Sequence, residues 1–228
     1  MKHIGIAAVT AEGAALCYKT VCQRASELLG AHKHPEITLH TNSFHKILEA
    51  QRSEDWKTVA DLILESLSHL KKSGADFAII PANSVHFPFA AIKAKSPLQV
   101  WSIVEVAGKE CAARKYKKVL TLGVGITMSR GLFTEELKKY GIESVVPTAP
   151  DQEVMNQIIY DELVQSKILP ASVARLIQIV ENYKKSGIDA VLLGCTELPL
   201  ALNEENLRLP VIDTTRLLAI RAAEEAVQ

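Results

Sequence analysis

The segments "KKSGIDAVLLGCTELPL" (residues 184–200) and "KKSGADFAIIPANSVHF" (residues 71–87) align with each other without a gap. Each starts like the polar end of a helix, passes a glycine and an aspartate, and continues as a short apolar run, which predicts a helix followed by a buried strand. In this alignment Ala82 stands opposite Cys195. The repeat therefore predicts two similar halves that carry different groups, a methyl and a thiol, at one equivalent position.

Short apolar runs alternate with helical patterns along nearly the whole chain, which favours parallel βαβ units. We expect an α/β fold of two Rossmann-like halves with parallel sheets, related by a pseudo-two-fold axis. The first half should span residues 1–97, with residues 208–228 returning to it, and the second half residues 98–207. Because open parallel sheets bind ligands beyond the carboxyl ends of their strands, Ala82 and Cys195 are expected at a ligand cleft between the halves. The expected strands cover residues 4–9, 37–42, 76–82, 119–125, 141–147 and 190–195, and the expected helices residues 12–29, 56–72, 132–140 and 152–185, the last with a break near Pro170.

The composition favours a small-molecule ligand. Lys and Arg number 26, as do Asp and Glu, and the one basic cluster, residues 114–118, fits a solvated helix end, so we expect no nucleic-acid partner. Charges interrupt every apolar run, which predicts no membrane span, and the first residues lead directly into a strand, so a cytoplasmic protein is expected. The four cysteines are too scattered for a disulfide framework.

Six segments carry a resemblance to the cofactor-independent aspartate/glutamate racemase superfamily. The pairing of "GCTELPL" with "VIDTTR" in this order and spacing is the most specific of them. The segments are "AAVTAEGAA", "IIPANSVHF", "TMSRG", "QIIYDEL", "LGCTELPL" and "VIDTTR".

The resemblance implies an amino-acid racemase that needs no pyridoxal phosphate and no metal, commonly a homodimer, with one cysteine from each half beside the substrate's α-carbon. One thiolate removes the α-proton and the other thiol returns a proton on the opposite face. Cys195 matches one of these cysteines. A helix N-terminus after the strand would lower the pKa of its thiol.

The first-half motif departs from the family's pattern, because Ala82 occupies the position of the other catalytic cysteine. Three explanations are open. The chain is a racemase altered at position 82, or a natural member in which Ser84, His86 or a held water serves that face, or an enzyme that uses one thiol for a different reaction.

Several polar residues match the parts of the family's motifs that bind substrate. We expect Thr127 and Thr196, together with the turn at Asn83 and Ser84, to hold the α-carboxylate, and His86 either to tune the site or to serve structure. Thr10 lies in the loop after the first strand, where it, or Glu12, could equally cap the first helix. The candidate residues of the site are thus Thr10, Ala82, Asn83, Ser84, Thr127, Cys195, Thr196 and Arg52.

The resemblance implies aspartate or glutamate as substrate, although the cation expected near the distal carboxylate is not obvious. The family's lysine position is Val164 here, Lys167 follows three residues later, and Arg52 is the other plausible cation. We interpret Cys17, Cys22 and Cys111 as packing residues, and Asp213 with Arg216 as a structural join. His32 and His34 lack a third ligand, so zinc is not expected.

Three functions therefore compete. The first is a racemase of aspartate or glutamate, the second a one-thiol decarboxylase or cis–trans isomerase of the same superfamily, and the third a catalytically silent amino-acid-binding protein.

Overall fold

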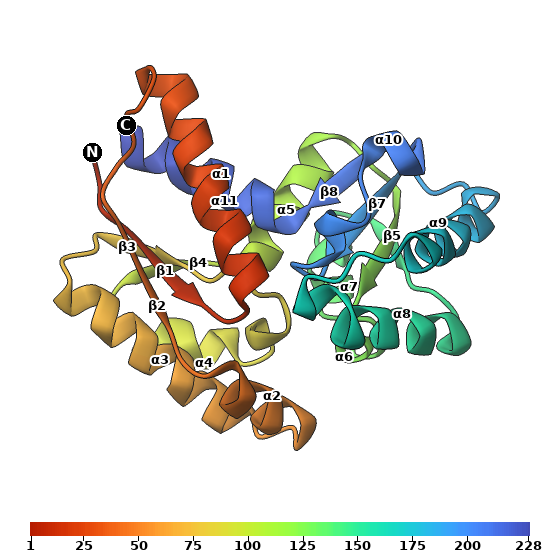
Figure 1. Cartoon of the computed structure of the whole chain (residues 1–228), viewed down its shortest axis with the longest axis horizontal. Coiled ribbons are helices and arrows are strands. Elements are labelled where there is room, and N and C mark those ends of the chain that lie inside the picture. The colour runs from red at the N-terminus through yellow and green to blue at the C-terminus, as the bar shows by residue number, and fades with distance from the viewer. The chain divides into compact units, whose positions relative to one another are not determined.

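The computed structural model describes all 228 residues, and the chain divides into two compact units (Figure 1). Unit 1 comprises residues 1–103 and 215–228, and unit 2 comprises residues 104–214. None of the helices combines the length and the apolar character that a membrane span requires.

Unit 1 contains a four-stranded sheet with helices on both faces. In Figure 1, α1 and α11 lie on one side of this sheet, and α3 with α4 on the other. The elements are β1 (Ile4–Ala8), α1 (Ala11–Leu29), β2 (Ile37–Thr41), α2 (Phe44–Arg52), α3 (Trp56–Lys72), β3 (Phe77–Ile79), a short 3₁₀ helix (Ser84–His86), α4 (Phe89–Lys95), β4 (Gln99–Trp101) and α11 (Thr214–Val227).

Unit 2 repeats this plan with its own four-stranded sheet. Its helices α8 and α9 supply much of the apolar core that packs against β5 and β7. The elements are α5 (Ile103–Ala113), β5 (Lys118–Gly123), α6 (Gly125–Ser129), α7 (Thr134–Lys138), β6 (Glu143–Val145), α8 (Ala149–Asp161), a 3₁₀ helix (Leu163–Gln165), α9 (Pro170–Lys184), β7 (Ala190–Gly194), a 3₁₀ helix (Leu198–Leu200), α10 (Glu204–Leu207) and β8 (Val211–Asp213).

Both sheets are wholly parallel and have the same strand order. The order is β2-β1-β3-β4 in unit 1 and β6-β5-β7-β8 in unit 2, so the strands correspond one to one. The β5–β7 register runs from Val119 opposite Ala190 to Gly123 opposite Gly194. The α/β fold of two similar halves with parallel sheets is therefore confirmed.

The repeated residues turn out to build the scaffold. Gly74 and Gly187 follow α3 and α9 with φ of 90° and 73°, a conformation that ends a helix and that glycine adopts without a Cβ penalty. The aspartate that follows in each copy accepts a hydrogen bond at the start of the first strand of its own unit, from His3 just before β1 or from Lys118 in β5. Asp76 accepts from the His3 amide at 2.7 Å, and Asp189 accepts from the Lys118 amide at 2.9 Å. Position 82 and position 195 follow this shared frame of glycine and aspartate, six residues after the aspartate in each copy.

The boundaries between the halves differ from the sequence-based expectation of 1–97, 98–207 and 208–228. β4 pairs with β3 and therefore belongs to unit 1, and β8 pairs with β7 and therefore belongs to unit 2. The chain returns to unit 1 only at Thr215, next to the segment with Asp213 and Arg216 that the sequence indicated as a join. An Arg24–Glu224 ion pair of 2.8 Å ties α11 to α1.

Candidate active site

The strand order fixes where each unit can bind a ligand. In unit 1 the chain runs from β1 to β2 on one side of β1, and from β2 it crosses to β3 on the other side of β1. The order of the strands therefore reverses between the adjacent strands β1 and β3. In unit 2 the same reversal falls between β5 and β7. Open parallel sheets bind ligands beyond the carboxyl ends at such a point. Thr10 and Ala82 follow the two strands of unit 1, and Cys195 follows the second of the two strands in unit 2.

In unit 2, the thiol of Cys195 donates a hydrogen bond to Glu197. The Sγ–Oε2 distance is 3.0 Å, and the hydroxyl of Thr196 donates to the same carboxylate oxygen at 2.8 Å. All three residues are buried. A buried carboxylate within hydrogen-bond distance of a thiol can accept its proton, so this arrangement is capable of proton transfer.

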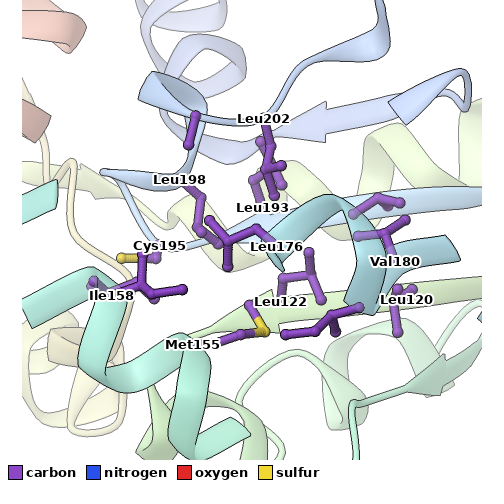
Figure 2. Close-up of a cluster of buried hydrophobic side chains, with 14 of the residues drawn as sticks. Leu120, Leu122, Met155, Ile158, Leu176, Val180, Leu193, Cys195, Leu198 and Leu202 are labelled. Carbon is purple, nitrogen blue, oxygen red and sulfur yellow. The ribbon is translucent and has the colours of Figure 1, made fainter. Parts of the chain in front are cut away.

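Cys195 lies at the edge of the main apolar cluster of unit 2, beside Ile158 (Figure 2). Its side chain is 7% exposed. Burial raises the pKa of the Cys195 thiol well above its ordinary value, and the negative charge and hydrogen bond of Glu197 raise it further. The backbone amides of Glu197 and Leu198 act in the opposite direction but are outweighed. The expected lowering of this pKa by a helix N-terminus is therefore wrong. Only a 3₁₀ helix of three residues follows β7.

Thr127 lies in α6, in the segment that follows β5. Its hydroxyl is buried and makes no hydrogen bond within the structure, and the residue is 1% exposed. Nearby, Asn156 of α8 accepts a hydrogen bond from the Gly125 amide at 3.0 Å, which holds the start of α6. Buried hydroxyls normally have partners, so an unpaired one at this edge of the sheet suits a ligand contact.

Close backbone packing positions Cys195. A Cβ at Gly194 would lie 2.8 Å from both the Leu122 carbonyl oxygen and the Phe133 ring, and a Cβ at Gly123 would lie 2.9 Å from the Gly194 carbonyl oxygen. Real Cβ atoms essentially never approach so closely. Glycine at both positions allows the backbones of β5 and β7 to pack closely at their carboxyl ends. This close packing fixes the position of Cys195, the residue directly after β7.

In unit 1, His86 fixes the turn that starts at Ala82. Its Nδ1 lies 2.8 Å from the Ala82 carbonyl oxygen, and its Nε2 accepts a hydrogen bond from the Ile103 amide at 3.4 Å. A carbonyl can only accept, so Nδ1 carries the proton. Burial lowers the pKa of His86 to about 4. With both ring nitrogens occupied and the ring neutral, His86 is suited to hold the turn and poorly suited to carry a proton.

Ser84 accepts a hydrogen bond from a residue that the sequence analysis did not single out. Gln51, near the end of α2, donates from Nε2 to Ser84 Oγ at 2.9 Å. Gln51 and Asn83 are both buried, and Ser84 is partly exposed. The signal that could have found Gln51 is weak, because a single glutamine in a polar helix end looks like a surface residue.

The remaining candidates lie apart from these contacts. Thr10 is the N-cap of α1 and accepts from the Gly13 amide at 3.3 Å, in line with the capping role. Arg52 is exposed at the end of α2. Val164 packs against the unit 2 core, and Lys167 is exposed and bonds to Gln165 at 2.8 Å. Cys17 and Cys111 are buried and Cys22 is partly buried.

Comparisons with known proteins fit this geometry. The sequence profile described as Asp/Glu/Hydantoin racemase matches residues 6–222. A glutamate racemase from Aquifex aeolicus (strain VF5) is 26% identical over 171 residues, which cover 72% of this chain and 63% of that protein, so less than two thirds of the relative is matched. The broad specificity amino-acid racemase RacX from Bacillus subtilis (strain 168) is 26% identical over 170 residues, 75% of this chain and 73% of RacX. The solved structure of a proposed Asp/Glu racemase from Yersinia pestis superposes with a TM-score of 0.89 at 30% identity, and the match covers 100% of both chains.

Proposed function

Because the chain belongs to the Asp/Glu/Hydantoin racemase family, we propose that it is a cofactor-independent amino-acid racemase of the aspartate/glutamate type in which Cys195 is the acid/base. The observation that carries this proposal is the buried hydrogen bond of 3.0 Å from Cys195 Sγ to Glu197 Oε2. It supplies a thiol and a proton acceptor at the carboxyl end of a central strand, where ligands of this fold class bind.

The proposed step is a proton transfer at the α-carbon. The Cys195 thiolate takes the α-proton, and the electron pair of the broken C–H bond delocalises into the substrate's α-carboxylate. Because the resting group is a thiol with a raised pKa, its proton must first pass to Glu197 or to water. The substrate's α-ammonium group would favour the thiolate, since a nearby positive charge stabilises an anion.

In unit 1, the turn after β3 has no side-chain proton carrier at the position equivalent to Cys195. Ala82 has only a methyl group, and His86 uses both ring nitrogens for the backbone. We propose that water supplies the proton on the substrate's other face. Exchange of the α-proton with retention needs Cys195 alone, because the proton leaves and returns on one face of the substrate. Inversion also needs a proton donor on the opposite face and should therefore be slower.

Substrate binding is proposed for the polar residues around the two strand ends. Thr127 with its unpaired buried hydroxyl, Thr196, and the turn at Asn83 and Ser84 would hold the α-carboxylate. Arg52 is the candidate cation for a distal carboxylate, since it is exposed and close in sequence to Gln51, which contacts Ser84. The names of the matched relatives support an amino-acid substrate, and we propose aspartate or glutamate.

We further propose a cytoplasmic homodimer that has no nucleic-acid or membrane partner. The balanced charge of 26 basic and 26 acidic residues supports the absence of a nucleic-acid partner, and the dimer is proposed from the resemblance to the family. Sedimentation of the full chain at micromolar concentration tests the assembly. A single species near 25.0 kDa would contradict the dimer.

A second candidate is a one-thiol enzyme of the same superfamily, either a decarboxylase or a cis–trans isomerase. Ala82 carries no proton, and His86 is neutral with both ring nitrogens in hydrogen bonds to the backbone. This combination favours a one-thiol enzyme, since such reactions need a proton on one face of the substrate only. The third possibility is a protein that binds an amino acid without turning it over.

Deuterium exchange separates these functions. The wild-type chain is incubated in deuterated buffer with each enantiomer of aspartate and of glutamate, while proton NMR follows α-deuteration and chiral chromatography follows inversion. The racemase predicts α-deuteration together with slower inversion. Deuteration without any inversion indicates the one-thiol enzyme, and binding without deuteration indicates the silent protein.

A further inference from the structure

We propose that Gln51 is a positioning residue that makes the Ser84 hydroxyl a hydrogen-bond donor toward an anionic group of the ligand. This inference rests on the proposed function, because it assigns Ser84 to a carboxylate of the amino-acid substrate. It goes beyond the motif residues, since Gln51 lies in α2, outside the turn that follows β3.

The contact between Gln51 and Ser84 is short and sheltered. Nε2 of Gln51 lies 2.9 Å from Ser84 Oγ, and Gln51 is 7% exposed. Ile47, one turn earlier in α2, and Ala50, directly before Gln51, are also buried, so this side of α2 packs inward. A buried amide group that lost its partner would be left with the cost of desolvation, which is why the contact is expected to persist.

The polarity of this contact decides what Ser84 can do. A serine hydroxyl has one proton to donate and two lone pairs that accept. Since the amide N–H of Gln51 occupies one lone pair, the hydroxyl proton points away from Gln51. Ser84 is partly exposed, two residues after Ala82, so that proton is available to a ligand at the end of β3. A carboxylate can only accept hydrogen bonds, and a hydroxyl held in this way presents to it a donor that is already oriented.

The end of α2 is itself anchored, which lets Gln51 act as a fixed support. The Asp55 amide donates to the Ala50 carbonyl at 2.8 Å, which closes the chain directly after the helix. The ring of Trp56, at the start of α3, lies 4.9 Å from the ring of Phe87, at the end of the 3₁₀ helix that Ser84 begins. The end of α2, through Gln51, and the start of α3, through Trp56, thus contact the two ends of this 3₁₀ turn.

A double-mutant cycle distinguishes positioning from simple packing. Gln51→Met keeps the length of the side chain but removes the donor, and Ser84→Ala removes the hydroxyl. If Gln51 acts through Ser84, Gln51→Met should weaken substrate binding in the wild type but have almost no effect in the Ser84→Ala background. Glu49→Gln, an exposed change in the same helix, is the matched control.

The measurements are KM and kcat of α-deuteration and the Kd of L-aspartate and L-glutamate by calorimetry, with Tm as a check on folding. We expect Gln51→Met to raise KM and Kd about five-fold with kcat nearly unchanged, as for the loss of one oriented hydrogen bond that acts in binding. An equal rise in the Ser84→Ala background, or no rise with Gln51→Met, would overturn the inference. If the wild type binds these amino acids but shows no deuteration, the proposed function fails, while the cycle in Kd still tests Gln51.

Discussion

Cys195 and Glu197 form a buried thiol–carboxylate pair, with Sγ and Oε2 3.0 Å apart. The carboxylate opposes ionisation of the thiol in two ways, by its charge and by accepting the thiol's proton in a hydrogen bond. The same carboxylate accepts the thiol's hydrogen bond, so in the proposed reaction it could take the proton when a bound substrate favours the thiolate. Burial first, and Glu197 in addition, therefore raise the pKa of the resting thiol and keep it protonated.

Replacing Glu197 with glutamine should lower the pKa of the Cys195 thiol, because both contributions of the carboxylate disappear while the burial remains. The rate of alkylation by iodoacetamide, followed from pH 6 to pH 10 by mass spectrometry of the Cys195 peptide, should then rise at a lower pH than in the wild type. Glu205→Gln, at an exposed position in the same unit, is the control. An unchanged or upward-shifted pH profile for Glu197→Gln would contradict this account.

Gly194→Ala should destabilise unit 2 and displace the thiol. The added Cβ would meet the Leu122 carbonyl and the Phe133 ring at 2.8 Å, and backbone atoms there cannot move aside cheaply. We expect a loss of about 1–3 kcal/mol in the free energy of unfolding by urea, together with lower activity. Gly125→Ala is the control, since its Cβ would find nothing closer than Asn156 Oδ1 at 3.5 Å. Equal stability of the two variants would show that the close approach is unimportant.

His86 should make the protein's stability depend on pH on the acid side. Its pKa is about 4 in the folded protein because of burial, against an ordinary value of 6.5. Between these values the unfolded state binds a proton that the folded state does not, so stability is lost as the pH falls from 6.5 toward 4. The wild type's advantage over His86→Asn should shrink by on the order of 3 kcal/mol across that window. Urea unfolding at pH 7, 6, 5 and 4 tests this, with the exposed His45→Asn as control. A constant advantage would be inconsistent with a neutral buried ring.

Most of the scaffold could be predicted from the sequence because its signals are local. The apolar runs at β1, β5 and β7 and the long amphipathic pattern of α3 are periodic, and Gly74 and Gly187 mark the helix ends. Strands β4 and β8 were harder to predict. Each has only three residues, and pairing with a neighbouring strand, not periodicity, assigns it to a unit.

The candidate site could be predicted only in outline. In each unit the position after the strand, β3 or β7, follows from the repeat and the fold class, and Cys195 follows from its motif. The protonation of Cys195 could not be predicted, because it depends on burial and on the orientation of the Glu197 side chain. Gln51 was missed for a similar reason, since its partner Ser84 is distant in sequence and no periodic pattern connects them.

Ala82→Cys should accelerate inversion much more than α-deuteration. The substitution supplies a proton carrier at the position equivalent to Cys195, where the chain now has a methyl group. A well-placed acid or base contributes about 10² to 10⁴ in rate, and the ratio of inversion to exchange should rise accordingly. Ala82→Ser, with a hydroxyl of much higher pKa, is the matched control. If the wild type already inverts the substrate rapidly and Ala82→Cys leaves that rate unchanged, another group already supplies the proton for inversion, and the prediction is contradicted.

We propose that this chain moves the substrate's α-proton with one thiol, that of Cys195. Proton NMR of aspartate and glutamate in deuterated buffer tests it most directly, with wild type, Cys195→Ala and, as control, Cys111→Ala at equal concentration and with equal circular dichroism. We predict α-deuteration by the wild type and by Cys111→Ala, and none above the protein-free background by Cys195→Ala. Undiminished deuteration by Cys195→Ala would contradict the account.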